Sequence, residues 1–93
     1  MEKTVQILKQ YPLQERQYTD RNGTPQVFAS RGFEMTDGID TFYAEAVGDF
    51  ARSLMELDPS VYHRLQGQMT CREYKGSDGT IHHQNEVKII KIS

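Results

Sequence analysis

Residue types that catalyse reactions or bind metals are present in this chain, but their positions favour neither activity. His82 and His83 are adjacent on an expected strand, so their side chains point to opposite faces and cannot hold one metal ion together. His63 is distant from both in the sequence, and a pair formed with Cys71 would lack a third group to orient it. No Gly-rich phosphate-binding loop precedes the expected helix. We therefore expect a protein that is not an enzyme and that uses no metal or other cofactor.

Length, cysteine content and hydropathy are typical of a small globular protein. The 93 residues suffice for one domain, 1–93. Cys71 is the only cysteine, so no internal disulfide can form, and we interpret it as a passive strand residue in a reducing compartment. No apolar run approaches the roughly 20 residues of a membrane span, and the start lacks the apolar stretch of a signal peptide. We expect a cytoplasmic protein with no membrane partner.

Net charge does not by itself indicate a nucleic-acid partner. The chain has 11 Lys and Arg against 13 Asp and Glu, a formal net charge of −2, whereas DNA-binding domains often carry a basic surplus. Basic residues do recur in the last third of the chain, which favours a basic stripe there: Arg64, Arg72, Lys75, Lys88 and Lys91.

The elements that would position any site begin with β-structure. Residues 4–9, 14–19 and 26–35 are expected to be extended. Between the last two lies Asn22-Gly23, a dipeptide that tolerates the positive φ of a tight turn, so these stretches are predicted to form a hairpin. The next strand is expected at 41–47. Its alternation places one set of side chains on one face and a second set on the other: Phe42, Ala44 and Ala46 against Tyr43, Glu45 and Val47.

One helix is predicted, over residues 49–57, with Asp49 as its cap. Its apolar face includes Met55, which we interpret as core filler together with Met69. Because about two turns of helix are marginal alone, this helix is expected to close one end of a sheet. Two more strands, 61–74 and 81–92, follow, and Gly67 is expected to bend the first of them.

The order of elements predicts an all-β fold, a five-stranded OB-fold Greek-key barrel with one short helix between strands 3 and 4. Another small barrel or an α+β roll could have the same order of elements.

Several motifs resemble the core of bacterial single-stranded-DNA-binding proteins. The stretch from Gly67 to Tyr74, the Gly-containing turn after it and the Glu86-Val87 pair resemble the last hairpin of that family. The segment from Thr41 to Ala51 is similar to the aromatic-bearing third strand and the start of the family's helix. Arg16-Gln17-Tyr18 and Asn22-Gly23 extend the similarity over most of the chain.

The resemblance implies a set of binding residues. Tyr43 and Tyr74 would occupy positions where the family presents tryptophans to bases, and Phe33 would stand in a loop that carries a third stacking ring. Arg72 and Lys75 would contact phosphates beside Tyr74. The alternative from the residues alone is that the tyrosines are ordinary half-buried strand residues, which are common in any sheet.

The sequence also departs from the family. The third strand is short, so Val47 stands near the place of a second stacking aromatic, and Glu45 lies on the expected binding face, where the family tends to place a basic residue. The chain ends at Ser93 without the family's flexible acidic tail. Tail-less relatives such as the primosomal replication protein are therefore the nearer comparison.

Two functions follow as hypotheses. The first is a protein that binds single-stranded DNA, or RNA, without sequence preference and assists replication or recombination. The alternative is an OB-type module that binds protein and no nucleic acid. In either case a homo-oligomer, a dimer or a tetramer, is expected, with the first strand around Val5 and Ile7 as the interface.

Overall fold

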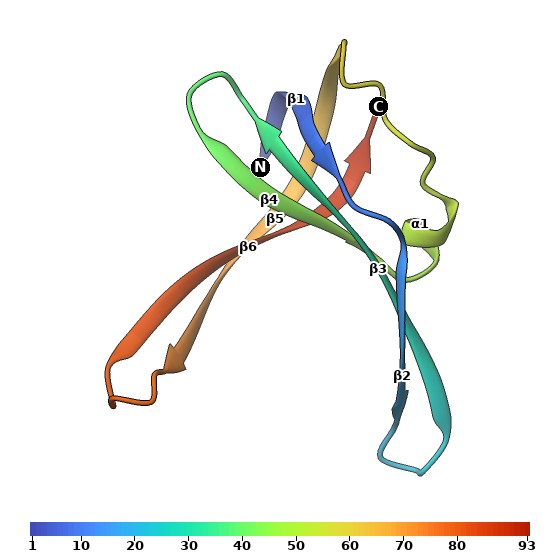
Figure 1. The fold of residues 1–93 in the computed structure, drawn as a ribbon, viewed down its shortest axis with the longest axis vertical. Coiled ribbons are helices and arrows are strands. Elements are labelled where there is room, and N and C mark those ends of the chain that lie inside the picture. Colours follow the sequence, from blue (N-terminus) through green and yellow to red (C-terminus); the bar gives the residue numbers. More distant parts are fainter.

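The computed structural model describes residues 1–93, and its strands form one closed sheet (Figure 1). The elements are β1 (Glu2–Gln10), β2 (Gln14–Thr19), β3 (Pro25–Thr36), β4 (Thr41–Val47), α1 (Gly48–Ser53), β5 (Tyr62–Lys75) and β6 (Ile81–Ile92). The strand order is β1-β5-β6-β4-β3-β2, and an additional pairing of β1 with β3 closes the ring. All neighbours are antiparallel except β4 and β6, which are parallel.

The inside of the ring is the hydrophobic core, and strand alternation fills it. The expected alternation of residues 41–47 is confirmed, because Ala44 and Ala46 are fully buried while Tyr43 is on the outer side. The other strands contribute in the same way. The buried cluster consists of Val5, Ile7, Phe33, Met35, Ala44, Ala46, Ala51, Leu65, Val87 and Ile89.

The six extended stretches expected from the sequence are all present, and they form the five strands of the predicted barrel because the first strand is interrupted around Pro12. Up to Gln10 the chain pairs with the second half of β3. From Gln14 onward, β2 pairs with the first half of β3. Proline has no N–H to donate to a ladder, so the break falls where the chain crosses from the ring to a projecting hairpin. β1 and β2 are thus two parts of one interrupted strand.

Two hairpins project from the ring and descend below it in Figure 1, β5–β6 toward the lower left and β2–β3 toward the lower right. We call them the β2–β3 arm (residues 14–30) and the β5–β6 arm (residues 70–86). The Asn22-Gly23 turn of the first is confirmed: Gly23 has φ +77°, and the Asp20 carboxylate accepts the N–H groups of Asn22 and Thr24, both at 2.9 Å. The bend expected at Gly67 is also present, as a register shift between Gln66 and Gly67.

The helix is shorter than predicted, ending at Ser53 instead of residue 57. Asp49 is not its cap, because Val47 holds that position and Asp49 instead forms an ion pair with Arg52 at 2.8 Å. After the helix, distant side chains bind the backbone. Arg31 donates to the Leu54 carbonyl at 2.7 Å. The Gln10 amide bonds both the N–H and the carbonyl of Leu57, at 2.8 and 2.7 Å.

Three other expectations about packing are wrong. Met55 and Met69 are not core filler, since 81% and 51% of their surfaces are exposed. Val5 and Ile7 cannot form an oligomer interface, because their side chains are buried inside the ring. Oligomerisation itself stays a prediction.

No helix in the structure has the length and apolar character that crossing a bilayer requires.

Candidate functional site

Tyr43 lies at the centre of the outer face between the two arms. Its phenol covers Gly32 on the neighbouring strand so closely that a Cβ at position 32 would overlap it. Tyr11 supports the ring from the side, with ring centroids 6.1 Å apart and planes tilted by 55°. Half of the Tyr43 side chain remains exposed (52%). Because Gly32 has no side chain, the Tyr43 ring packs flat against the backbone of β3, and the exposed part of the ring stays accessible to a ligand.

Three shallow hollows, of about 140, 470 and 430 Å³, meet around Tyr43 and Glu45. Glu45 lines all three, and Tyr43 lines two of them. We call the joined hollows the central groove. Toward the β2–β3 arm it is lined by Tyr11, Pro12, Gln14, Glu15, Arg16, Phe28, Ser30 and Gly32. Toward the β5–β6 arm it is lined by Val47, Gln68, Thr70, Gln84, Asn85, Glu86, Val87 and Lys88.

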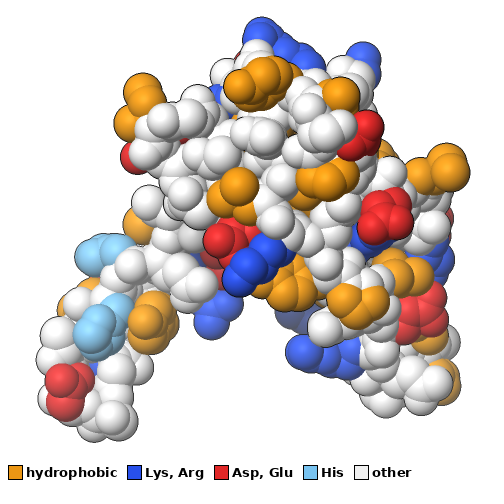
Figure 2. All heavy atoms as spheres, turned by 45° about the horizontal axis from the view of Figure 1, so that its top comes forward, with side chains coloured by type: hydrophobic (Ala, Val, Ile, Leu, Met, Phe, Trp, Pro, Cys, Tyr) orange, Lys and Arg blue, Asp and Glu red, His pale blue; other side chains and the backbone are white.

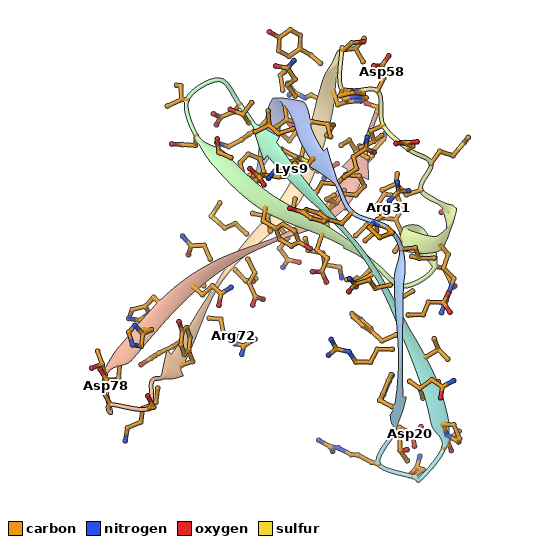
Figure 3. All side chains as sticks on the ribbon, in the orientation of Figure 1. Lys9, Asp20, Arg31, Asp58, Arg72 and Asp78 are labelled. Carbon is orange, nitrogen blue, oxygen red and sulfur yellow. The ribbon has the colours of Figure 1, made fainter.

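The β5–β6 arm presents Tyr74 and Arg72 on the same side as the groove. Strand alternation places them with Thr70, which lines the groove. Tyr74 stacks on His82 of the facing strand, with centroids 5.3 Å apart and planes 22° from parallel. In Figure 3, Arg72 points from the arm toward the space between the arms. Its guanidinium is 3.5 Å from Glu86, an exposed pair that a phosphate could compete for.

Lys75 does not share this side, although the resemblance implied that it would. It is one residue beyond Tyr74 on the same strand, so alternation directs it to the opposite face of the arm. Nor do the basic residues of the last third form one stripe. Arg64 pairs with Glu2 at 3.4 Å, in the part of β5 that belongs to the ring, outside the β5–β6 arm.

Phe33 is not a stacking residue. It lies in the middle of β3 with none of its surface exposed, and the Arg31 guanidinium covers its ring at 5.4 Å from the centroid. The expectation of a loop position is wrong because the strand runs without interruption to Thr36. Phe33 also shares the inward face of β3 with Met35, which is buried beside it.

The β2–β3 arm supplies groove residues that the sequence analysis missed. Phe28 and Arg16 are cross-strand partners and both line the groove. Phe28 is exposed, and so is Tyr18, which alternation places on the same side as Arg16. Alternation along residues 26–35 could have placed Phe28 on the face opposite Phe33, but only the structure shows that Phe33 is buried and that the other face lines the groove.

Charge in the groove is mixed rather than basic. The lining includes three carboxylates, Glu15, Glu45 and Glu86, and two cations, Arg16 and Lys88. Figure 2 likewise shows basic side chains with acidic ones beside them in the space between the arms. Partial burial, together with the nearby charge of Glu45, raises the pKa of Tyr43. The phenol is therefore neutral at physiological pH.

The remaining reactive side chains form no metal site. Cys71 is exposed, with its sulfur 3.9 Å from Nδ1 of His83, and no group of three or more potential ligands is present. His63 is buried and its Nε2 bonds the Asp58 carbonyl at 2.8 Å, so it fixes the loop after the helix. These groups offer no alternative to the groove as the candidate site.

Comparisons with known proteins identify the fold. No protein-family model matches the chain, and no curated protein sequence matches it. Among solved structures, the second OB-fold domain of replication protein A from Methanococcus maripaludis is similar, with a TM-score of 0.61 and 14% sequence identity. The alignment covers 99% of this chain and 79% of that one. The chain has the OB fold, as the order of its elements predicted.

Proposed function

We propose that this protein binds single-stranded DNA in the central groove, as an accessory to replication or recombination. The observation that carries the proposal is the half-exposed ring of Tyr43 packed on Gly32, with Phe28 and Arg16 on one side and Lys88 on the other lining the same groove. The similar domain of replication protein A supports the replication setting.

Stacking would supply the main attraction. Each base stacked on an aromatic ring contributes about 1 to 3 kcal/mol without selecting sequence. Tyr43 and Phe28 line hollows of the groove, and Tyr74 lies farther out on the β5–β6 arm, on the same strand side as Thr70, so a strand could cross from arm to arm over three rings. Single-stranded nucleic acid exposes the faces of its bases to such rings, while a duplex does not.

Phosphate contacts would be few. Arg16, Arg72 and Lys88 are the cations placed to reach a backbone in the groove. Three neutralised phosphates on a single strand correspond to a slope of log K against log salt of about −2. We therefore expect a weaker salt dependence than that of strongly basic DNA-binding proteins.

A second candidate function is binding to a protein partner. The observation that favours it is the mixed charge of the groove, where Glu15, Glu45 and Glu86 would repel phosphates. A basic segment of another protein would find those carboxylates complementary.

Titration of the purified chain with fluorescent oligo-dT at low and high salt separates the two. Saturable binding that weakens at high salt, with much weaker binding to a duplex of the same length, is the expected result. Oligo-U in parallel measures the preference for DNA or RNA. Absence of binding at low ionic strength and high micromolar protein would refute the DNA proposal and favour the protein-binding module.

A further inference from the structure

Glu45 is an unpaired carboxylate at the middle of the groove. It is half-buried, it lines all three hollows, and none of the five ion pairs of the structure includes it. Lys88 is its backbone neighbour on β6, yet the two side chains are not paired. A groove that only attracted phosphates would gain nothing from this charge, since it repels them.

The position of Glu45 relative to Tyr43 gives the carboxylate a different use. The two residues are two positions apart on one strand face, so their Cα atoms are about 7 Å apart. Glu45 is also the cross-strand partner of Gly32, the residue that the Tyr43 phenol covers. The carboxylate therefore lies beside the ring, where the edge of a stacked base would be.

A carboxylate accepts hydrogen bonds and donates none, so it selects base edges by their donors. Guanine presents two adjacent donors on its Watson–Crick edge, the N1–H and the N2 amino group, which match the two carboxylate oxygens. Cytosine and adenine offer only the amino group on that edge. Thymine has one N–H between two carbonyl oxygens, which a carboxylate repels.

We propose that Tyr43 and Glu45 form a guanine-selective subsite, in which a base stacks on the Tyr43 ring and its donor edge bonds the Glu45 carboxylate. This inference rests on the proposed binding of single-stranded DNA. It adds a base preference at one position to binding that is otherwise independent of sequence. Gln14 and Ser30, which line the adjoining hollow, are placed to bond the remaining polar atoms of the base.

The test compares three short oligonucleotides: oligo-dT, an alternating thymine–guanine strand too short to form a quadruplex, and the same strand with inosine for guanine. Inosine keeps the N1–H and lacks the N2 amino group. Wild type is expected to bind the guanine strand about tenfold more tightly than oligo-dT, with inosine between them, because a bidentate pair of hydrogen bonds discriminates more strongly than a single one.

Glu45→Gln is expected to reduce the guanine preference to within twofold while binding oligo-dT more tightly, and Glu45→Ala is expected to abolish the preference. The matched control is Glu34→Gln. Glu34 is the cross-strand partner of Tyr43 but lines none of the three hollows, so this variant removes the same charge and should keep the preference. Thermal unfolding of each variant checks that the fold is retained.

The outcomes separate this inference from the proposed function. If wild type binds all three strands equally, or if Glu45→Gln tightens all three by one common factor, Glu45 only repels and the guanine subsite is refuted while DNA binding stands. A guanine preference that survives in Glu45→Ala would refute it as well. If no variant binds any strand at low ionic strength, the proposed function itself is wrong.

Discussion

The ring and the two arms share strands β3, β5 and β6, and nearly all buried side chains of these strands lie in their ring halves; Ala29 is the one buried residue in either arm. In β5, His63, Leu65 and Gly67 are buried, and every residue from Gln68 to Tyr74 is exposed. In β6 the order is reversed along the chain: residues 81–86 are exposed, and Val87 and Ile89 are buried. Each strand thus leaves the core at the edge of the central groove.

The difference in burial indicates that the closed sheet supplies the stability of the fold. An isolated two-stranded hairpin is marginal in water, so the arms depend on the ring for their stability and contribute little to it. The exposed aromatic side chains of the arms do not pack in the hydrophobic core: Phe28, Tyr18 and Tyr74. Under the proposed function these exposed aromatic side chains belong to the binding surface.

The largest expected effect compares Phe33 in the ring with Phe28 in an arm. Phe33→Ala should lower the free energy of unfolding by about 3 to 5 kcal/mol, because it opens a cavity in the core. Phe28→Ala should lower it by less than about 1 kcal/mol, because the side chain is exposed in the arm. Denaturant unfolding measures both. Equal losses would show that the β2–β3 arm is part of the stabilising structure.

Within the arms, the Tyr74 side chain should contribute to the affinity for oligonucleotide and not to the stability of the fold. Tyr74→Ala should weaken oligonucleotide binding by about 1 to 3 kcal/mol, with an unchanged salt slope, since stacking releases no counterions. Its thermal midpoint should stay near that of the wild type. A change in salt slope without a loss of stacking affinity would contradict the assigned role.

Arg72 and Lys75 test whether the groove side of the β5–β6 arm differs from its back. Arg72→Ala should make the slope of log K against log salt shallower by about 0.7, the contribution of one phosphate contact on a single strand. Lys75→Ala, on the opposite face, is the matched control and should leave the slope unchanged. Equal effects would mean that the strand wraps around the arm.

The smallest expected effect is on the stability of the closed sheet and involves neither arm. Lys3 bonds Asp37 at 2.6 Å, which holds the pKa of the Asp37 carboxyl well below its ordinary value near 3.9 and raises the pKa of Lys3. The stability supplied by the ionised carboxylate is present above pH 4 and is lost as the pH falls below that value. Asp37→Asn should therefore lower the thermal midpoint slightly at pH 7 and have less effect near pH 3. An equal effect at both pH values would show that the charge contributes nothing.

The local features could be predicted from the sequence in both regions. The alternation of Phe42, Ala44 and Ala46 indicated the buried face of β4 in the ring, and Asn22-Gly23 indicated the turn of the β2–β3 arm. The length of the helix could not be predicted in this way. Its end is determined by Gln10 and Arg31, whose side chains bond backbone groups 47 and 23 residues away along the chain.

The site was predicted in part, and its errors also have physical causes. Tyr43 lines the groove, and strand alternation places Tyr74 and Arg72 on the same side as Thr70, which lines it. Phe33 is buried and alternation directs Lys75 to the opposite face, because alternation decides the face and the resemblance did not take it into account. Whether any of these residues contacts nucleic acid stays a prediction. The packing of the Tyr43 ring on Gly32 could not be predicted at all. It requires Gly32 to lie diagonally across from Tyr43, which only the register of β3 with β4 shows.

The proposed function places single-stranded DNA in the groove between the arms. Titration of isotope-labelled protein with oligo-dT, followed by amide chemical shifts, locates the bound strand. We expect perturbations at Tyr43 and Glu45, at Arg16 and Phe28, and along residues 70–74, with Lys3 and Arg64 in the ring unaffected. Perturbations centred on Lys3 and Arg64, with none around Tyr43, would contradict this placement.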